Sequence, residues 1–181
     1  MRLVILAILP CLILIICGCG GSSSESNNPA EQTVVINESS IELNDVALIL
    51  PLQLTAIESA LGKWDRIFED HDNANITFYI WDSVGICIEH NSDTGNIIDL
   101  RFAFFIECGD TNPEQQFQGT ILVENLIVDK FSKVRDFEIA GYKSDVSSSN
   151  TYVRDFGNWT VSGFFGGEGN DALLKAFGIS T

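Results

Sequence analysis

The chain has 181 residues, of which 45% are hydrophobic and 19% are charged, and this composition excludes an intrinsically disordered protein. Its 25 acidic and 10 basic residues give a net charge of −15, which repels phosphate backbones, so we expect no nucleic-acid partner. The same charge suits a cationic partner, divalent cations or simple solubility.

The first eighteen residues have the pattern of a signal peptide. Arg2 is followed by an apolar run over residues 3–16 that only Pro10 interrupts. This run of about 14 residues is shorter than the roughly 20 that a helix needs to cross a bilayer, so we expect a cleaved signal. The end of the run resembles a bacterial lipobox, because Ile15, Ile16, Cys17 and Gly18 precede Cys19.

Cys19 is the predicted site of lipidation and the first residue after cleavage. Cys17 is excluded because the bulky Ile16 precedes it, whereas a small residue is required before the cleavage point. The alternative is a plain secretory signal with incidental cysteines. Residues 19–32 are rich in Ser, Asn, Glu and Gly, which predicts a flexible tether. By resemblance to enterobacterial sorting signals, Gly20 in place of Asp favours the outer membrane, with the domain facing the periplasm.

The remaining residues, 33–181, are expected to form a single domain that begins with strands. Strands are expected at residues 33–36 and within 40–50, with a turn at Asn44-Asp45. A helix is expected over residues 53–61, where Thr55 and Glu58 have capping-box spacing and Gly62 suits the C-terminus. An acidic loop over residues 63–75 then leads into a meander of three strands, expected at 76–81, 84–90 and 96–107.

The sequence predicts the secondary structure of the second half of the domain less clearly. We expect a loop at 108–116, a hairpin over 117–129 around Glu124-Asn125, a strand or short helix at 133–143, a loop-rich stretch over 145–158, a strand at 159–165 and a last helix over 170–178. The hairpins share a strand–Asn–strand rhythm, but no clear internal repeat is evident. Together these elements predict an α+β fold, an antiparallel sheet or meander with two short helices.

A short pattern in the first half carries a resemblance. Leu61-Gly62 ends the predicted helix, and Trp81-Asp82 with Gly85-Ile86 follows in the next strands. This order resembles a family of uncharacterised domains in bacterial envelope proteins and, more distantly, SmpA/OmlA-type lipoproteins and β-lactamase-inhibitor-like modules. The resemblance covers residues 41–106 and extends at most to 140. It implies a non-enzymatic module that binds protein, and it assigns no binding residue.

The residue groups that could form a metal, catalytic or phosphate-binding site match the known motifs poorly. Residues 69–75 offer oxygen ligands, but the spacing departs from a calcium loop, and His71 and His90 lack the partners of a zinc site. Ser83, His90 and Asp93 form a triad only on paper. Glycines within 163–171 match no phosphate-binding motif. We therefore expect no metal, no cofactor and no catalytic residue.

Two cysteines remain in the predicted mature domain, Cys87 and Cys108. An exported domain meets an oxidising compartment, so these two residues could form a disulfide. Buried free thiols are the alternative, because the strand register could place the two residues too far apart.

These observations predict a lipid-anchored envelope protein with a non-catalytic domain that binds another protein, either as an immunity protein or as an accessory to envelope assembly. The membrane is contacted through the N-terminal lipid. The alternatives are an enzyme of unrecognised type in the envelope and a structural lipoprotein without a tight partner.

Overall fold

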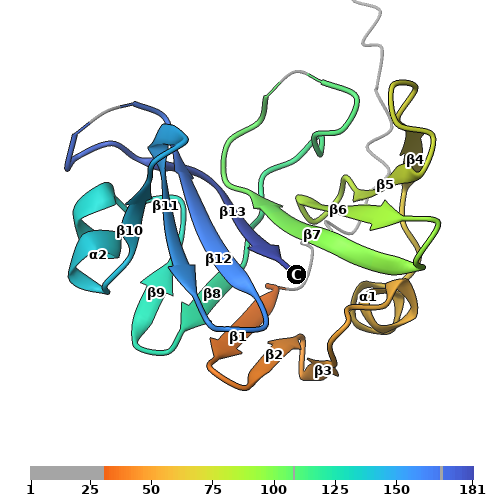
Figure 1. Cartoon of the computed structure of the whole chain (residues 1–181), viewed down its shortest axis with the longest axis horizontal. Helices are drawn as coiled ribbons and strands as arrows, with labels where there is room; N and C mark the ends of the chain where they lie inside the picture. Colours follow the sequence, from red (N-terminus) through yellow and green to blue (C-terminus); the bar gives the residue numbers. More distant parts are fainter. Residues whose placement is uncertain (1–30, 108, 168) are drawn as a thin grey trace, which may run out of the picture.

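β-Strands form most of the fold and are arranged in two sheets (Figure 1). The computed structural model describes residues 31–107, 109–167 and 169–181. Within these residues the expected α+β class is met in a coarse sense only, as a mostly β fold with two short helices. The predicted signal peptide and most of the predicted tether, including Cys19, lie outside the described residues.

The smaller sheet has five strands in the order β3-β2-β1-β8-β9. Their bounds are β1 Thr33–Asn37, β2 Ser40–Leu43, β3 Val46–Leu48, β8 Thr120–Val123 and β9 Leu126–Val128. The two predicted hairpins are confirmed as β2–β3 and β8–β9. Asn44 and Asp45 have φ values of 51° and 63°, the left-handed conformation that a tight two-residue hairpin turn requires.

The larger sheet has eight antiparallel strands in the order β10-β11-β12-β13-β7-β6-β5-β4. Their bounds are β4 Arg66–Glu69, β5 Ile76–Trp81, β6 Ile86–Asn91, β7 Asn96–Ala103, β10 Lys143–Asp145, β11 Ser148–Asp155, β12 Thr160–Phe165 and β13 Leu174–Ser180. The last strand, β13, lies at the centre of the sheet between β12 and β7, so the C-terminus lies in the middle of the molecule in Figure 1.

The two helices are α1 (Leu54–Leu61) and α2 (Val134–Ile139). The predicted first helix is confirmed, and Gly62 ends it with a φ of 82°. The predicted capping box is wrong, because α1 begins at Leu54 and its N-cap makes no side-chain hydrogen bond. The second helix settles the undecided segment at 133–143. Within the described part of the chain, no helix has the length and apolar character to cross a membrane.

Three predicted segments are wrong. The acidic loop contains the edge strand β4, the loop-rich stretch contains β11, and the expected last helix is the strand β13. The apolar spacing of residues 170–178 suits a helix locally. In the sheet, however, Phe177 and Ile179 point into the core and both edges of β13 are hydrogen-bonded, so tertiary pairing overrides local propensity.

The chain folds as two copies of one pattern, a finding that corrects the expectation of no internal repeat. Each copy is a hairpin, a helix and four antiparallel strands: β2–β3, α1 and β4–β7, then β8–β9, α2 and β10–β13. The turn residues Asn44 and Glu124, both with a φ of 51°, are eighty positions apart, and so are the buried helix residues Ile57 and Phe137. The two copies meet at β7 and β13 in the larger sheet.

One face of the larger sheet packs against the smaller sheet and both helices, and a single hydrophobic cluster fills the space between them. Alternate residues of the central strands, such as Leu100, Phe102 and Phe177, point into this core. The opposite face carries the intervening residues. No sheet or helix of the described residues covers that face, which we call the open face (Figure 1).

Candidate functional site

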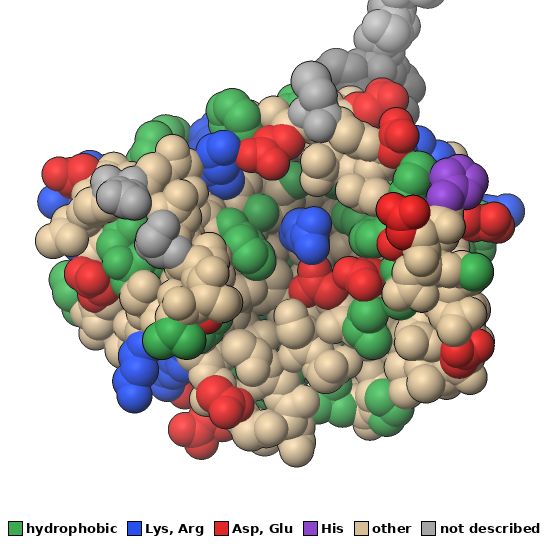
Figure 2. All heavy atoms as spheres, turned by 45° about the horizontal axis from the view of Figure 1, so that its top comes forward, with side chains coloured by type: hydrophobic (Ala, Val, Ile, Leu, Met, Phe, Trp, Pro, Cys, Tyr) green, Lys and Arg blue, Asp and Glu red, His purple; other side chains and the backbone are tan. Residues whose placement is uncertain are grey.

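The open face brings charged side chains together on its central strands. Glu89 of β6 lies opposite Asp99 of β7, and Arg101 lies two residues farther along β7. On the other side of β7, Asp99 pairs with Ser180 and Arg101 pairs with Gly178 of β13. Figure 2 shows this face, with a basic side chain beside acidic and hydrophobic ones at its centre. Glu89, Asp99 and Arg101 form what we call the central cluster.

Two groups of the central cluster, the Glu89 carboxylate and the Nε of Arg101, make no hydrogen bond within the described residues. Arg101 Nη2 lies 3.0 Å from Asp99 Oδ2, and Ser180 Oγ donates to Asp99 Oδ1 at 3.0 Å. The Glu89 carboxylate makes no hydrogen bond or ion pair within the described residues. Burial, and then the charge of Asp99, raises the pKa of Glu89, while Arg101 opposes the shift. The Nε of Arg101 is buried without a hydrogen-bond acceptor in the described part of the chain. A cation bound beside Glu89 would stabilise the charged form of its carboxyl group.

The small residue Gly178 leaves the open face recessed beside the central cluster. A Cβ on Gly178 would lie 3.2 Å from Ser162 Oγ and 3.3 Å from Asp99 Oδ1, so a larger side chain here would fill the surface beside the cluster. A hollow of about 340 Å³ opens next to Arg101 and is bordered by Phe164. The open face therefore combines a recess, a charged centre and an aromatic border.

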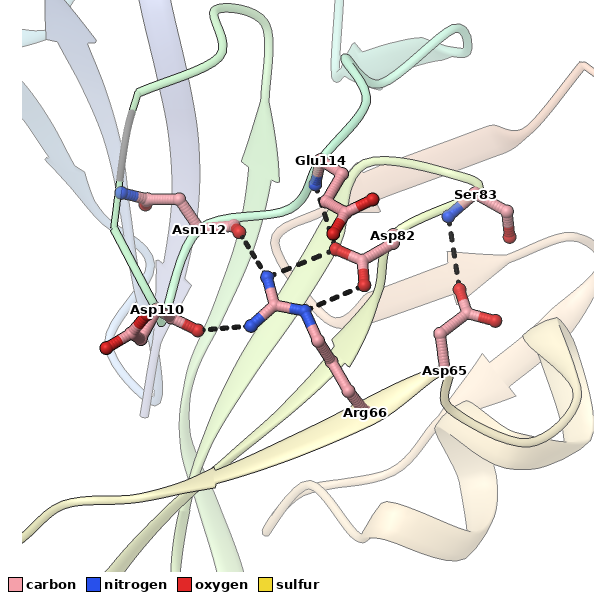
Figure 3. A network of polar contacts seen from close by, with 7 residues as sticks. All are labelled: Asp65, Arg66, Asp82, Ser83, Asp110, Asn112 and Glu114. Carbon is pink, nitrogen blue, oxygen red and sulfur yellow. Dashed lines mark hydrogen bonds and ion pairs between the residues drawn. The ribbon is translucent and has the colours of Figure 1, made fainter.

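The long loop between β7 and β8 is tied to the edge of the open face by one arginine (Figure 3). Arg66 of β4 forms an ion pair with Asp82, with Nε 2.8 Å from Oδ2. The same guanidinium donates to the carbonyl oxygen of Asn112 at 2.6 Å and to that of Asp110. The hydrogen bond to Asp82 raises the pKa of Arg66. The loop is thereby anchored beside the recess.

The residues that carried the family resemblance have structural roles. Trp81 Nε1 donates a hydrogen bond to the carbonyl oxygen of Gly62 at 2.9 Å, so the end of α1 is joined to the end of β5. Asp82 accepts from Arg66 and from a backbone N–H of the β7–β8 loop at 2.8 Å. Gly85 has a φ of 74°, and a Cβ there would collide with the backbone nitrogen of Phe117. The residues of this pattern therefore hold α1, the end of β5 and the β7–β8 loop together.

The structure does not bring together the hypothetical catalytic triad of Ser83, His90 and Asp93. Ser83 lies in the β5–β6 turn, whereas His90 lies near the far end of β6, roughly 13 Å of extended strand beyond the first residue of β6, Ile86. The ring of His90 packs edge-on against Tyr79 with centroids 5.6 Å apart. Asp93 accepts a hydrogen bond from the Asn75 side chain at 2.6 Å.

The other weak motifs have local explanations. In the acidic segment, Asp70 Oδ1 accepts from the backbone N–H groups of Asp72 and Asn73 at 2.9 and 3.3 Å, which closes a turn. Within the described ranges, no group of three His, Cys, Asp or Glu side chains is placed to hold a metal ion. The glycines of 163–171 precede a strand rather than a helix.

Cys87 lies on β6 beside the central cluster, opposite Arg101 in the register. Its thiol is buried and has no disulfide partner among the described residues, and burial raises its pKa to about 12. A thiol with this pKa stays protonated at physiological pH and is a poor nucleophile. Cys108 lies outside the described residues, so the pairing of Cys87 with Cys108 stays a prediction.

The central cluster is the feature that sequence reasoning missed. Its signal is present in the segment "IIDLRFA", where Asp99 and Arg101 alternate with the core residues Leu100 and Phe102. This alternation indicates a strand with one buried and one exposed face. Nothing local in the sequence indicates that Glu89 lies opposite Asp99, because that depends on the register of β6 and β7.

Comparison with known proteins gives one match. A family model described as a domain of unknown function (DUF7738) matches residues 33–138. The matched region contains β1, the whole first copy of the repeat, and the hairpin and most of the helix of the second copy. No curated protein and no solved structure matches the chain.

Proposed function

Because this chain belongs to the DUF7738 family, a domain of unknown function, its role has to come from its own geometry, and we propose that it is a lipid-anchored bacterial envelope protein that binds another protein without catalysis. The open face with its central cluster carries the proposal. The resemblance to SmpA/OmlA-type lipoproteins and to β-lactamase-inhibitor-like modules is part of it and rests on the short pattern around Gly62 and Trp81.

The partner is a protein that presents a basic side chain to Glu89 and Asp99. The two carboxylates lie side by side, and only Arg101 offsets their charge within the described residues. The surrounding half of the molecule is also acidic: residues 31–103 contain thirteen acidic and three basic residues. Such a field steers a basic partner and speeds its association. Phe164, 36% exposed on the same face, supplies an aromatic contact.

A site-specific crosslink tests this role. Phe164 is replaced by a photo-crosslinking phenylalanine analogue in cells that make the full chain, and Ile139, 85% exposed on α2, receives the same analogue as the matched control. We expect one discrete protein adduct from position 164 and none from position 139. Glu89→Lys should abolish the adduct. An adduct that persists in Glu89→Lys, or that forms equally from position 139, would rule out the open face as the binding surface.

The source of the captured protein separates the two versions of this function. A partner delivered by a neighbouring cell would make the protein an immunity protein, and acidity suits the capture of a basic toxin. A partner from the same envelope would make it an accessory to assembly. Both versions use the same face, so the crosslink tests them together, and identification of the adduct by mass spectrometry distinguishes them.

Lipidation of Cys19 places the domain at the membrane, in the outer membrane facing the periplasm. The apolar run, the small residue Gly18 before Cys19 and the polar segment after it support this localisation. Metabolic labelling with a palmitate analogue should mark the parent chain and leave Cys19→Ala unmarked. Equal labelling of the two chains would exclude Cys19 as the lipidated residue.

A further inference from the structure

A second surface, at one end of the open face, is apolar. Phe105, Phe131 and Leu173 are 52%, 68% and 49% exposed and border one hollow of about 940 Å³. We call these three residues the apolar patch. Single exposed hydrophobic residues are common, but large exposed side chains gathered around one hollow indicate a contact surface.

Basic side chains surround the apolar patch. The Nζ of Lys130 lies 5.3 Å from the centre of the Phe131 ring, and the Nζ of Lys175 lies 5.1 Å from that of Phe105. Lys133 and Arg135 lie nearby, where both contact Asp171 at the edge of the hollow. Four of the ten basic residues of a strongly acidic chain therefore lie at this one place. Asp171 pairs with Lys133 and Arg135, and Glu107 pairs with Lys175 at 2.8 Å, so among the described residues Lys130 is the one of the four without an ion pair. Aromatic side chains flanked by lysines are typical of surfaces that meet a bilayer at the headgroup level.

The chain enters the domain next to the same surface. The carbonyl oxygen of Gln32 accepts a hydrogen bond from Thr120 N at 3.0 Å, and Gln116, four residues earlier, borders the hollow. Glu31 follows Cys19 by twelve positions. A chain of that length spans at most about 40 Å, so a lipid on Cys19 keeps the patch within reach of the bilayer.

We propose that the apolar patch rests on the bilayer that holds the Cys19 lipid, with Phe131 at the headgroup level and Lys130 on the lipid phosphates. This inference rests on the proposed lipid anchor. Charge supports the orientation, because anionic headgroups repel the acidic first half of the domain and attract Lys130, which has no ion pair among the described residues. The hollow beside the central cluster shares Phe105 and Lys175 with the hollow at the apolar patch, so the protein-binding face opens beside the membrane.

Depth-dependent quenching tests the contact. The full acylated chain carrying Phe131→Trp is reconstituted into vesicles of phosphatidylethanolamine and phosphatidylglycerol, with or without bromine on the acyl chains. Ile139→Trp, on an exposed residue outside the patch, is the matched control. With the indole buried a few ångströms below the headgroups, the emission added by Phe131→Trp should fall to roughly half in brominated vesicles. The emission added by Ile139→Trp should be unchanged.

Vesicle flotation separates the failure of this inference from the failure of the anchor. If the full chain does not float with the vesicles while Cys19→Ala behaves identically, the anchor is wrong and the membrane contact falls with it. If the full chain floats but Phe131→Trp is quenched no more than Ile139→Trp, the anchor stands and the contact is wrong. That second result would leave the patch to another protein or to a second copy of the chain.

Discussion

Trp81 and Gly62 are joined by a hydrogen bond of 2.9 Å from the indole Nε1 to the carbonyl oxygen, although nineteen residues separate them. The bond fixes the C-terminus of α1 against the last residue of β5. Trp159 is buried to a similar degree, but its Nε1 has no partner in the described part of the chain. The two tryptophans therefore form a matched pair for measuring what the hydrogen bond contributes to stability.

We expect Trp81→Phe to lower the free energy of unfolding by about 1–3 kcal/mol, because it removes the hydrogen bond and part of a buried ring. Trp159→Phe removes the same ring atoms and an unsatisfied donor, so its cost should be smaller. Urea unfolding of both variants, followed by circular dichroism, measures the difference. Equal costs for the two variants would contradict a stabilising role for the Gly62 bond.

Gly163 of β12 allows α2 to pack closely on the larger sheet. A Cβ at this position would lie 2.5 Å from Cε1 of Phe137, which is buried against Phe165 and Phe177. We expect Gly163→Ala to cost about 1–3 kcal/mol through overpacking. Phe137→Leu opens a small cavity and should cost about 1–2 kcal/mol by itself.

Combining the two substitutions tests the contact. In the double variant the added methyl group occupies space that the ring has left, so its loss of stability should be smaller than the sum by at least about 0.5 kcal/mol. Gly167→Ala is the control, because a Cβ there meets no atom within 4 Å. Strict additivity in denaturant titrations would show that Gly163 is not held small by Phe137.

The sequence predicts the first copy of the repeat well, and physical reasons explain why. Its strands are rich in β-branched residues, its turn at Asn44-Asp45 has the expected chemistry, and Gly62 ends a helix with a clear apolar face. Prediction fails where a segment depends on distant partners. β4 pairs on one side only, with β5, and its polar Arg66 binds Asp82 and the β7–β8 loop.

The second copy shows the same limit more strongly. Its hairpin and helix keep the eighty-residue spacing to the first copy, but β11 is rich in Ser and Asn, and β13 has an apolar spacing that also suits a helix. Only the pairing of β13 with β7 and β12 makes it a strand. The central cluster depends on the register of β6 and β7, so its residues could be recognised as exposed but not as neighbours.

Cys87 tests whether the domain contains a disulfide. Burial raises the pKa of its thiol to about 12, so the thiol should remain unreactive toward iodoacetamide in the native protein between neutral and mildly alkaline pH. After unfolding in urea without a reductant, the peptide that contains Cys87 should be alkylated, because this thiol has no disulfide partner in the described part of the chain. Mass spectrometry of the two digests measures both states. A peptide that is alkylated only after reduction would show that Cys87 is in a disulfide.

Glu89 predicts a pH dependence whose sign follows from its raised pKa. Its carboxyl binds a proton more readily in the folded than in the unfolded state, so between the ordinary pKa of 4.5 and the raised value the folded protein carries more protons. Stability therefore falls as the pH rises through this window, and the loss is complete above the raised pKa. Glu89→Gln removes this contribution.

We expect Glu89→Gln to be more stable than the parent near neutral pH by roughly 0.2–1 kcal/mol, the usual scale for like charges facing each other across two strands. The gain should vanish at a pH below the ordinary pKa, where Glu89 is protonated in both states. Glu38→Gln, in the exposed β1–β2 turn, is the control and should show no such trend. Thermal unfolding at several pH values measures the difference. Because the same substitution removes a carboxylate from the proposed binding face, Glu89→Gln should also weaken the crosslink from position 164. A stabilised variant with unchanged crosslinking would show that Glu89 does not contribute to partner binding.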